Sequence, residues 1–250
     1  MTKVLDTDVH DHFDKLGKEM PNVNAVLDSS GRATSVRGNS WYDYISKHIV
    51  FDCLQLKSSE KILDYGTGVG RLANYFAPFV RQIDGVDVSH SLLEVARKNR
   101  HSKAHFFHSE QFWPQAIPNS YDKAFTFWVL AHISDELLVE TLQQIKQLLR
   151  PGGELIFFEQ TTPHSNNPSS VHIQRSSANY IALCERAGFA YVRHENVIKI
   201  PSRTLSVWKN NTWIPKLALP LFLKFEKMTI HRKPEFVEYY TTCFYFKKPS

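Results

Sequence analysis

The stretch Ile62-Leu63-Asp64-Tyr65-Gly66-Thr67-Gly68-Val69-Gly70-Arg71 decides the fold class of this 250-residue chain. Its first residues form a short apolar run typical of a buried strand, and Leu72, Phe76 and Phe79 then share one helical stripe. The alternate glycines between them let the backbone turn sharply and leave no Cβ between the backbone and a ligand. The stretch therefore predicts a strand, a ligand-binding loop and a helix, in that order.

The spacing of the glycines distinguishes this loop from two common nucleotide-binding loops. A dinucleotide fingerprint that began at Gly66 would need glycine or alanine at position 71, where this chain has Arg71. A Walker loop would need Gly-Lys followed by Ser or Thr, and the chain lacks that sequence here. Neither of these two kinds of site is predicted.

A carboxylate follows at the end of the next apolar run, Ile83-Asp84-Gly85-Val86-Asp87, 21 residues after Gly66. An acid at the tip of a strand can accept hydrogen bonds from both hydroxyls of a ribose, a contact worth roughly 1.5–3 kcal/mol. Asp87 is therefore expected to bind a ribose. The alternative is an acid in an ordinary surface turn.

Apolar runs and helical spacings alternate along the rest of the chain. Strands are predicted at residues 61–64, 82–88, 104–107, 123–129, 154–159, 191–200 and 239–247. Helices are predicted from Ser40, after Ser89, over 135–149 and over 176–187, where Gly188 ends the last one. Strands that alternate with helices imply a parallel sheet.

Residues 40–190 resemble the class I S-adenosylmethionine-dependent methyltransferases, because several motifs occur in the right order. The strand and loop at 62–70 resemble the first motif of that family, and Gly85-Val86-Asp87-Val88-Ser89 the second. Ser109-Glu110-Gln111 stands at the adenine-contacting segment, with serine and glutamate where the family has glycine and aspartate. Trp128-Val129-Leu130-Ala131-His132 resembles the segment after the fourth strand, and Leu149-Arg150-Pro151-Gly152-Gly153 the loop before the fifth.

This resemblance implies an α/β, Rossmann-like three-layer sandwich with a mostly parallel seven-stranded sheet and an antiparallel C-terminal strand. The implied cofactor is S-adenosyl-L-methionine, with S-adenosyl-L-homocysteine as its product. In relatives with the same Gly-x-Gly-Arg pattern, the arginine similar to Arg71 pairs with the methionine carboxylate; an exposed residue of the first helical turn is the alternative. The residues expected around the cofactor are Arg37, Tyr42, Gly66, Thr67, Gly68, Gly70, Arg71, Asp87, Val88, Glu110, Gln111 and Trp128.

Two side chains at the expected carboxyl edge of the sheet are candidates for proton transfer. His132 follows the fourth strand, and an imidazole with an ordinary pKa of about 6.5 suits proton abstraction near neutral pH. Glu159 ends the fifth strand, as a second base or as a residue that orients the acceptor. The alternative for both is a structural role. The polar, proline-broken stretch 161–175 and the helix after it are expected to shape the acceptor pocket, through His164, His172, Arg175 and Tyr180.

Composition places the chain among ordinary globular proteins, with 42% hydrophobic and 22% charged residues. The acidic first twenty residues contain no apolar stretch of a secretory signal, so a cytoplasmic location is expected. Three widely separated cysteines predict neither a disulfide framework nor a zinc site, and no metal is expected. We divide the chain into an N-terminal extension (1–39), a cofactor-binding core (40–200), an aromatic and basic insertion that forms a lid or a docking element (201–238) and a last core strand (239–250).

The net charge of +5 is concentrated at the C-terminal end of the chain. Residues 199–250 contain ten Lys and Arg against three acids, whereas residues 1–198 sum to −2. Such a stretch favours contact with an anionic acceptor or an anionic membrane surface, and a solvated face without a partner is the alternative. The apolar residues 217–225 are too few to span a bilayer, which needs about 20.

Three functions remain open at this point. The first is O-methylation of a small molecule or glycan, including phosphorylated or acidic ones. The second is N-methylation, because the stretch 128–132 followed by Glu159-Gln160 resembles protein α-amine methyltransferases. The third is a non-catalytic cofactor-binding partner subunit, against which the intact loop and Asp87 argue. No nucleic-acid partner is expected.

Overall fold

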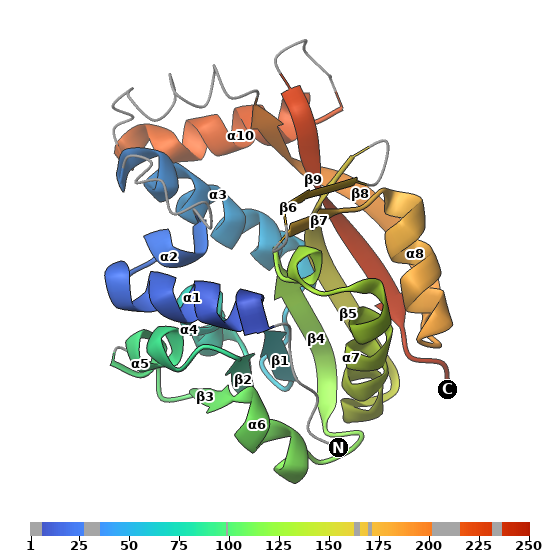
Figure 1. Ribbon diagram of the computed structural model, residues 1–250. Coiled ribbons are helices and arrows are strands. Elements are labelled where there is room, and N and C mark those ends of the chain that lie inside the picture. The colour runs from blue at the N-terminus through green and yellow to red at the C-terminus, as the bar shows by residue number, and fades with distance from the viewer. Residues whose placement is uncertain are drawn as a thin grey trace.

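The computed structural model describes residues 7–27, 36–98, 100–162, 166–169, 172–201, 216–231 and 237–250. Its centre is a seven-stranded sheet in the order β3-β2-β1-β4-β5-β9-β8 (Figure 1). The strands are β1 (Lys61–Tyr65), β2 (Gln82–Asp87), β3 (Ala104–His108), β4 (Tyr121–Phe127), β5 (Leu149–Thr161), β8 (Ala190–Pro201) and β9 (Val237–Lys247). The predicted fold class is confirmed.

The direction of the strands places the loops that follow β1, β2, β4 and β5 at one edge of the sheet. Strands β1 to β5 pair in parallel, and β9 pairs antiparallel with both β5 and β8. The predicted antiparallel C-terminal strand is therefore β9. Because the carboxyl ends of β1, β2, β4 and β5 meet at the same edge, the loops that follow them come together there.

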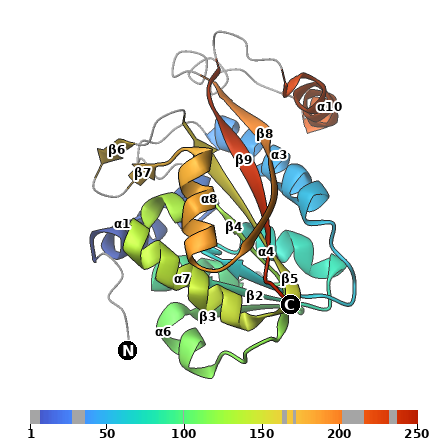
Figure 2. The same ribbon diagram turned by 90° about the vertical axis from the view of Figure 1, so that its right-hand side faces the viewer.

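Helices cover both faces of the sheet and bury two separate apolar cores (Figure 2). One core lies under α3 (Val36–Leu54), α4 (Arg71–Phe76), α5 (His90–Lys98) and α10 (Leu219–Thr229). The other lies under α6 (Ser109–Phe112), α7 (Asp135–Leu148) and α8 (Ser177–Arg186). Strand residues alternate between the two, as Ile62 and Leu63 of β1 do, because successive side chains of a strand point to opposite faces.

Most boundaries lie within a few residues of those predicted, with differences at capping residues and in the connections. Ser40 lies inside α3, which begins at Val36, and so does not cap it. Ser134 and Ser176 do cap α7 and α8, because their side chains accept hydrogen bonds from Leu137 N and Asn179 N. Short 3₁₀ turns follow several elements: η1 (Ala77–Phe79), η2 (Trp113–Gln115), η3 (Leu130–His132) and η4 (Lys216–Ala218).

Three features were not predicted, and two of them form part of the site. The N-terminal region contains α1 (Thr7–Glu19) and α2 (Asn24–Leu27), which pack next to α5 and α3. A small hairpin of β6 (Asn166–Ser169) and β7 (His172–Gln174) follows β5. The third feature is α10, which lies within the predicted insertion. None of the described helices is long and apolar enough to cross a bilayer.

Candidate active site

The glycine-rich loop closes over the ends of β1 and β2. Gly66 and Gly68 have φ values of 77° and 56°, a left-handed conformation that glycine adopts without strain. The N–H groups of Gly66 and Thr67 both donate to Val86 O, at 2.8 and 3.0 Å. The loop is therefore fixed to β2, with Gly66 and Gly68 facing a pocket.

Asp87 lies at the end of β2 and holds the same loop from the other side. One carboxylate oxygen accepts a hydrogen bond from Gly68 N at 2.7 Å, and the other accepts one from Ser89 N at 2.9 Å. Burial raises the pKa of Asp87, while these backbone N–H groups oppose that shift. The carboxylate also lines the pocket, so its remaining acceptor positions are available to a ligand.

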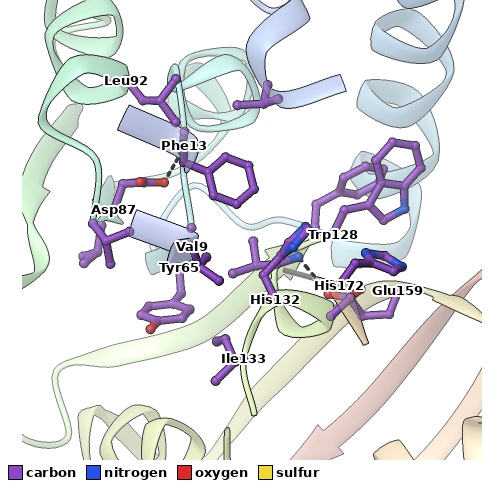
Figure 3. Close-up of a pocket in the computed structure, with 18 of the residues that line it drawn as sticks. Val9, Phe13, Tyr65, Asp87, Leu92, Trp128, His132, Ile133, Glu159 and His172 are labelled. Carbon is purple, nitrogen blue, oxygen red and sulfur yellow. Dashed lines mark hydrogen bonds between the residues drawn. The ribbon is translucent and has the colours of Figure 1, made fainter. Parts of the chain in front are cut away.

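The pocket has a volume of about 420 Å³ and lies at the carboxyl edge of the sheet, beneath α1 and α2. In Figure 3, Asp87 lies on one side of this pocket, His132, His172 and Trp128 lie on the other, and Phe13 projects between them. Its size suits a small ligand. Asp87 lies opposite the two histidines, and we call the side of Asp87 the expected ribose end and the side of His132 and His172 the expected acceptor end.

Helix α1 covers the pocket with Val9 and Phe13 and is fixed to α5 by Asp14. Asp14 accepts hydrogen bonds from Ser91 N at 3.0 Å and Ser89 Oγ at 3.2 Å, and pairs with Lys18 at 2.7 Å. Burial would raise the pKa of Asp14, but these hydrogen bonds outweigh it and lower the pKa well below its usual range. Asp14 therefore stays ionised at neutral pH and keeps α1 in place.

The loop after β4 carries the candidate base and is held by Glu159. Trp128 has a φ of 57°, and its N–H donates to Phe158 O at 2.9 Å. Glu159 Oε1 accepts from Val129 N at 2.8 Å and from Leu130 N at 2.6 Å. Burial raises the pKa of Glu159 to about 7 against the effect of these bonds. Because this carboxylate fixes the loop that presents His132, Glu159 is a positioning residue; its predicted role as a base stays a prediction.

His132 lies half-buried between two other rings at the acceptor end. Its ring centroid is 5.0 Å from that of Phe13 and 5.4 Å from that of His172, both in edge-to-face arrangements. Burial, and then the nearby charge of Arg175, lower the pKa of His172. A neutral His172 is thus favoured beside His132. Gln160 and Gln174 also line the pocket.

The comparisons with known proteins place this site in a family. A family model described as AdoMet dependent proline di-methyltransferase matches residues 14–210. The chain belongs to this family. It is therefore an S-adenosylmethionine-dependent methyltransferase, and its cofactor is S-adenosyl-L-methionine.

Relatives of this methyltransferase are named as N-methyltransferases. It is 27% identical over 197 residues to N-terminal Xaa-Pro-Lys N-methyltransferase 1-A of Xenopus laevis, which covers 75% of this chain and 87% of that one. It is 26% identical over 196 residues to N-terminal Xaa-Pro-Lys N-methyltransferase 1 of Danio rerio, which covers 75% and 86%.

Two solved structures share the fold. An S-adenosylmethionine-dependent methyltransferase of Leishmania major has a TM-score of 0.65 at 16% identity and covers 99% of this chain and 87% of its own. Phosphoethanolamine N-methyltransferase 1 of Haemonchus contortus, in complex with phosphoethanolamine and S-adenosylhomocysteine, has a TM-score of 0.65 at 17% identity and covers 100% and 50%. At such identities the likeness shows the fold alone.

The backbone at the glycine loop suits the methyltransferase's cofactor. A Cβ added to Gly68 would lie 2.6 Å from Val26, and one added to Gly66 would lie 2.7 Å from a methyl group of Val129. Any other residue at these two positions would therefore force the loop or its neighbours to move. Asp87 would hold the ribose, and Val88 and Ser109, which also line the pocket, would border the adenine. When bound, the cofactor supplies a methyl group on a positively charged sulfur.

The structure brings together part of the predicted set. Of the residues predicted for the site, those that line the pocket are Gly66, Gly68, Asp87, Val88, Trp128, His132, Glu159 and His172. Thr67 and Gly70 support the loop instead: Thr67 Oγ1 donates to Asp64 at 2.7 Å, and Gly70, with a φ of 71°, precedes α4. Tyr42 packs against Trp128 with ring centroids 6.3 Å apart. The side chains of Arg37 and His164 lie outside the described residues.

Arg71 does not line the pocket and is bound to α3. Its guanidinium donates to Ser46 Oγ at 2.7 Å, lies 3.5 Å from Asp43 and stacks over the ring of Phe127 with its central carbon 5.0 Å from the centroid. Phe127 separates it from the pocket by lining the wall itself. The predicted contact with the methionine carboxylate stays a prediction.

Two predicted substrate contacts are wrong. Arg175 is only 1% exposed. Its guanidinium donates to Leu130 O at 2.8 Å and pairs with Asp135 at 2.7 Å, so it binds the loop and not a substrate. Tyr180 is completely buried in the core between Phe157 and Phe244. Neither residue lines the pocket. Both therefore stabilise the acceptor end from behind.

The residues predicted to contact the adenine do not line the pocket. Glu110 and Gln111 are exposed on α6, whereas the preceding Ser109 is buried and lines the pocket. The adenine contact of Glu110 and Gln111 stays a prediction. Sequence reasoning also missed Val9 and Phe13, whose apolar spacing with Leu16 was the available signal.

Proposed function

We propose that this methyltransferase methylates the α-amine at the N-terminus of a peptide or protein. The observation that carries the proposal is the family match over 14–210, together with relatives whose names specify N-terminal N-methylation. These names favour our second hypothesis, N-methylation, over our first hypothesis, O-methylation.

The acceptor end of the pocket supports this chemistry. An α-amine has an ordinary pKa of about 7.7–8.0 and attacks only when it is neutral. His132 would accept the proton that the nitrogen loses, because it lines the pocket on the side opposite Asp87. Trp128 and Phe13 would exclude water from the reacting atoms. His172 would pack against His132 and restrict its ring.

The pocket lining also indicates which side chains the enzyme can recognise after the N-terminal residue of a substrate peptide. The relatives are named for a lysine in the third position, and a lysine side chain is best recognised by a free carboxylate. Among the described residues, two carboxylates line this pocket: Asp87 lies at the expected ribose end, and Glu159 accepts hydrogen bonds from backbone N–H groups. The stretch 160–184 contains no acid. We therefore propose that lysine in the third position is not required.

A peptide panel tests the proposal. Each peptide is prepared with a free N-terminus and as its N-acetylated twin, with lysine, glutamine or glutamate as the third residue. We expect mass spectrometry to locate added methyl groups on the free α-amine, none on the acetylated twins, and no more than about a tenfold preference for lysine. Methylation of hydroxyl groups in a glycan pool, with none on any amine, would contradict the proposed reaction. A strict lysine requirement would contradict the specificity alone.

A further inference from the structure

Helix α10 presents two opposite faces, and both are apolar. Its inner face packs against α3 and β8 through Leu223 and Ile230, which are 8% and 9% exposed. On the same face, Glu226 accepts a hydrogen bond from Lys199 N at 2.8 Å. The helix is therefore attached to the body of the protein through its inner face.

The outer face forms an exposed apolar stripe. Leu217, Leu221, Phe225 and Met228 are 96%, 70%, 63% and 70% exposed. Because residues four and three positions apart share a helical face, these side chains lie side by side along α10 and the turn before it. We call these four residues the outer stripe. Four large apolar side chains in a row in water mark a binding surface.

The charges around the outer stripe are positive. Lys224, Lys227 and His231 are exposed, and Lys227 also pairs with Asp52 of α3. The single acid of residues 216–231 is Glu226, which lies on the inner face. Tryptophan and basic residues adjoin this stretch in the sequence: Trp208, Lys209, Trp213, Arg232 and Lys233. Within the described residues 216–231, the outer surface thus combines apolar residues with cations, and the neighbouring acid Asp52 of α3 is paired with Lys227.

We propose that the outer stripe docks this protein onto an anionic lipid surface. Helices that lie in the membrane interface have this composition, with leucine and phenylalanine on one face and lysine beside them. Protein–protein interfaces, by contrast, are depleted in lysine. The opposite charge of the rest of the chain, −2 over residues 1–198, would orient α10 toward an anionic surface.

The position of α10 in the fold permits such docking. Figures 1 and 2 show α10 at an outer corner of the molecule, away from α6 and α7. A flat surface can therefore contact the outer stripe without displacing the sheet. The proposal does not depend on which acceptor the enzyme methylates, because none of the four residues lines the pocket.

Vesicle sedimentation tests the proposal with the full chain. We expect the protein to pellet with vesicles of phosphatidylcholine and phosphatidylserine, to pellet poorly with pure phosphatidylcholine, and to be released by salt. Leu221→Glu and Phe225→Glu should each reduce the binding by at least about tenfold, and Lys224→Ala by about fivefold. The matched control is Ile117→Glu, since Ile117 is 68% exposed in the connection before β4, outside α10. This control should bind as the unchanged protein does.

Three results would overturn the proposal. The first is no pelleting with either vesicle by a protein that is folded and active in solution. The second is equal loss of binding in Ile117→Glu and Phe225→Glu. The third is absence of vesicle binding together with a concentration-dependent dimer that Phe225→Glu dissociates, which would assign the outer stripe to contact between two copies.

Discussion

Asp87 is the residue expected to bind the ribose of the cofactor. Its two oxygens accept from Gly68 N and Ser89 N, and the group still faces the pocket. We expect Asp87→Ala to weaken the binding of S-adenosylmethionine by about 1.5–3 kcal/mol, the range for charge-assisted hydrogen bonds. Titration calorimetry would measure this change. Glu94→Ala is the matched control, because this acid is exposed on α5 and does not line the pocket. Equal affinity in both variants would remove Asp87 from the ribose.

His132 is the residue that would accept the proton in the proposed reaction. If it accepts the proton of the amine, His132→Ala should slow turnover by about 10²- to 10⁴-fold while the cofactor affinity stays near its original value. His105→Ala provides the control, because His105 lies on β3 beside Asp84 and outside the pocket. Unchanged turnover in His132→Ala would show that alignment of the reactants alone suffices. Single-turnover rates at saturating cofactor are the appropriate measurement.

The segment from β4 to the end of η3 is held in place by side chains of other elements. Glu159 reaches it from β5, and Arg175 binds Leu130 O and Ile133 O from beyond β7. The acceptor end therefore consists of a short loop clamped from two sides by buried charges. Such a clamp fixes the position of His132 at the pocket.

Mutation of Glu159 can show whether it accepts a proton or only holds the loop. A glutamine at position 159 can still accept the two N–H bonds through its amide oxygen, but it cannot take up a proton. We expect Glu159→Gln to keep turnover within about tenfold, and Glu159→Ala to lower both turnover and thermal stability, since two buried N–H groups lose their acceptor. Loss of turnover in Glu159→Gln as complete as in Glu159→Ala, with an unchanged melting temperature, would instead support proton transfer by Glu159.

At the scale of the whole molecule, two buried carboxyls make stability depend on pH. Burial raises the pKa of both Asp64 and Glu159 to about 7. The unfolded chain loses these protons near pH 4 and the folded chain near pH 7, so the folded state binds more protons between these values. The stabilisation is thus complete below pH 4 and is lost as the pH rises through 7.

We expect the melting temperature to fall between pH 5 and pH 8 by a few degrees more in the unchanged protein than in Glu159→Gln. His108 and His172 have lowered pKa values because they are buried, and they act with the opposite sign in this range. The comparison of the two proteins cancels their contribution. Identical pH profiles would show that Glu159 stays ionised in the folded state at pH 5.

The sequence predicted the sheet well because its signals are local. Each strand is a short apolar run, and the loop at 66–70 and Asp87 follow their strands directly. The errors concern long-range contacts. Arg175 was expected at the substrate because it stands in a polar stretch, yet carbonyl oxygens some 45 residues earlier in the chain enclose it. The apolar spacing of Val9, Phe13 and Leu16 indicates a buried face of α1, but the position of Phe13 over the pocket depends on the packing of α1 against α5, which is far away in the sequence.

A crystal structure with S-adenosylhomocysteine would test the central claim most directly, namely that the pocket under α1 binds the methyl donor between Asp87 and His132. We predict both ribose hydroxyls within hydrogen-bonding distance of the Asp87 carboxylate, about 2.5–3.0 Å, and the sulfur directed toward the end of the pocket that His132 lines. A nucleoside bound elsewhere on the molecule, or bound in this pocket with its sugar turned away from Asp87, would contradict the account.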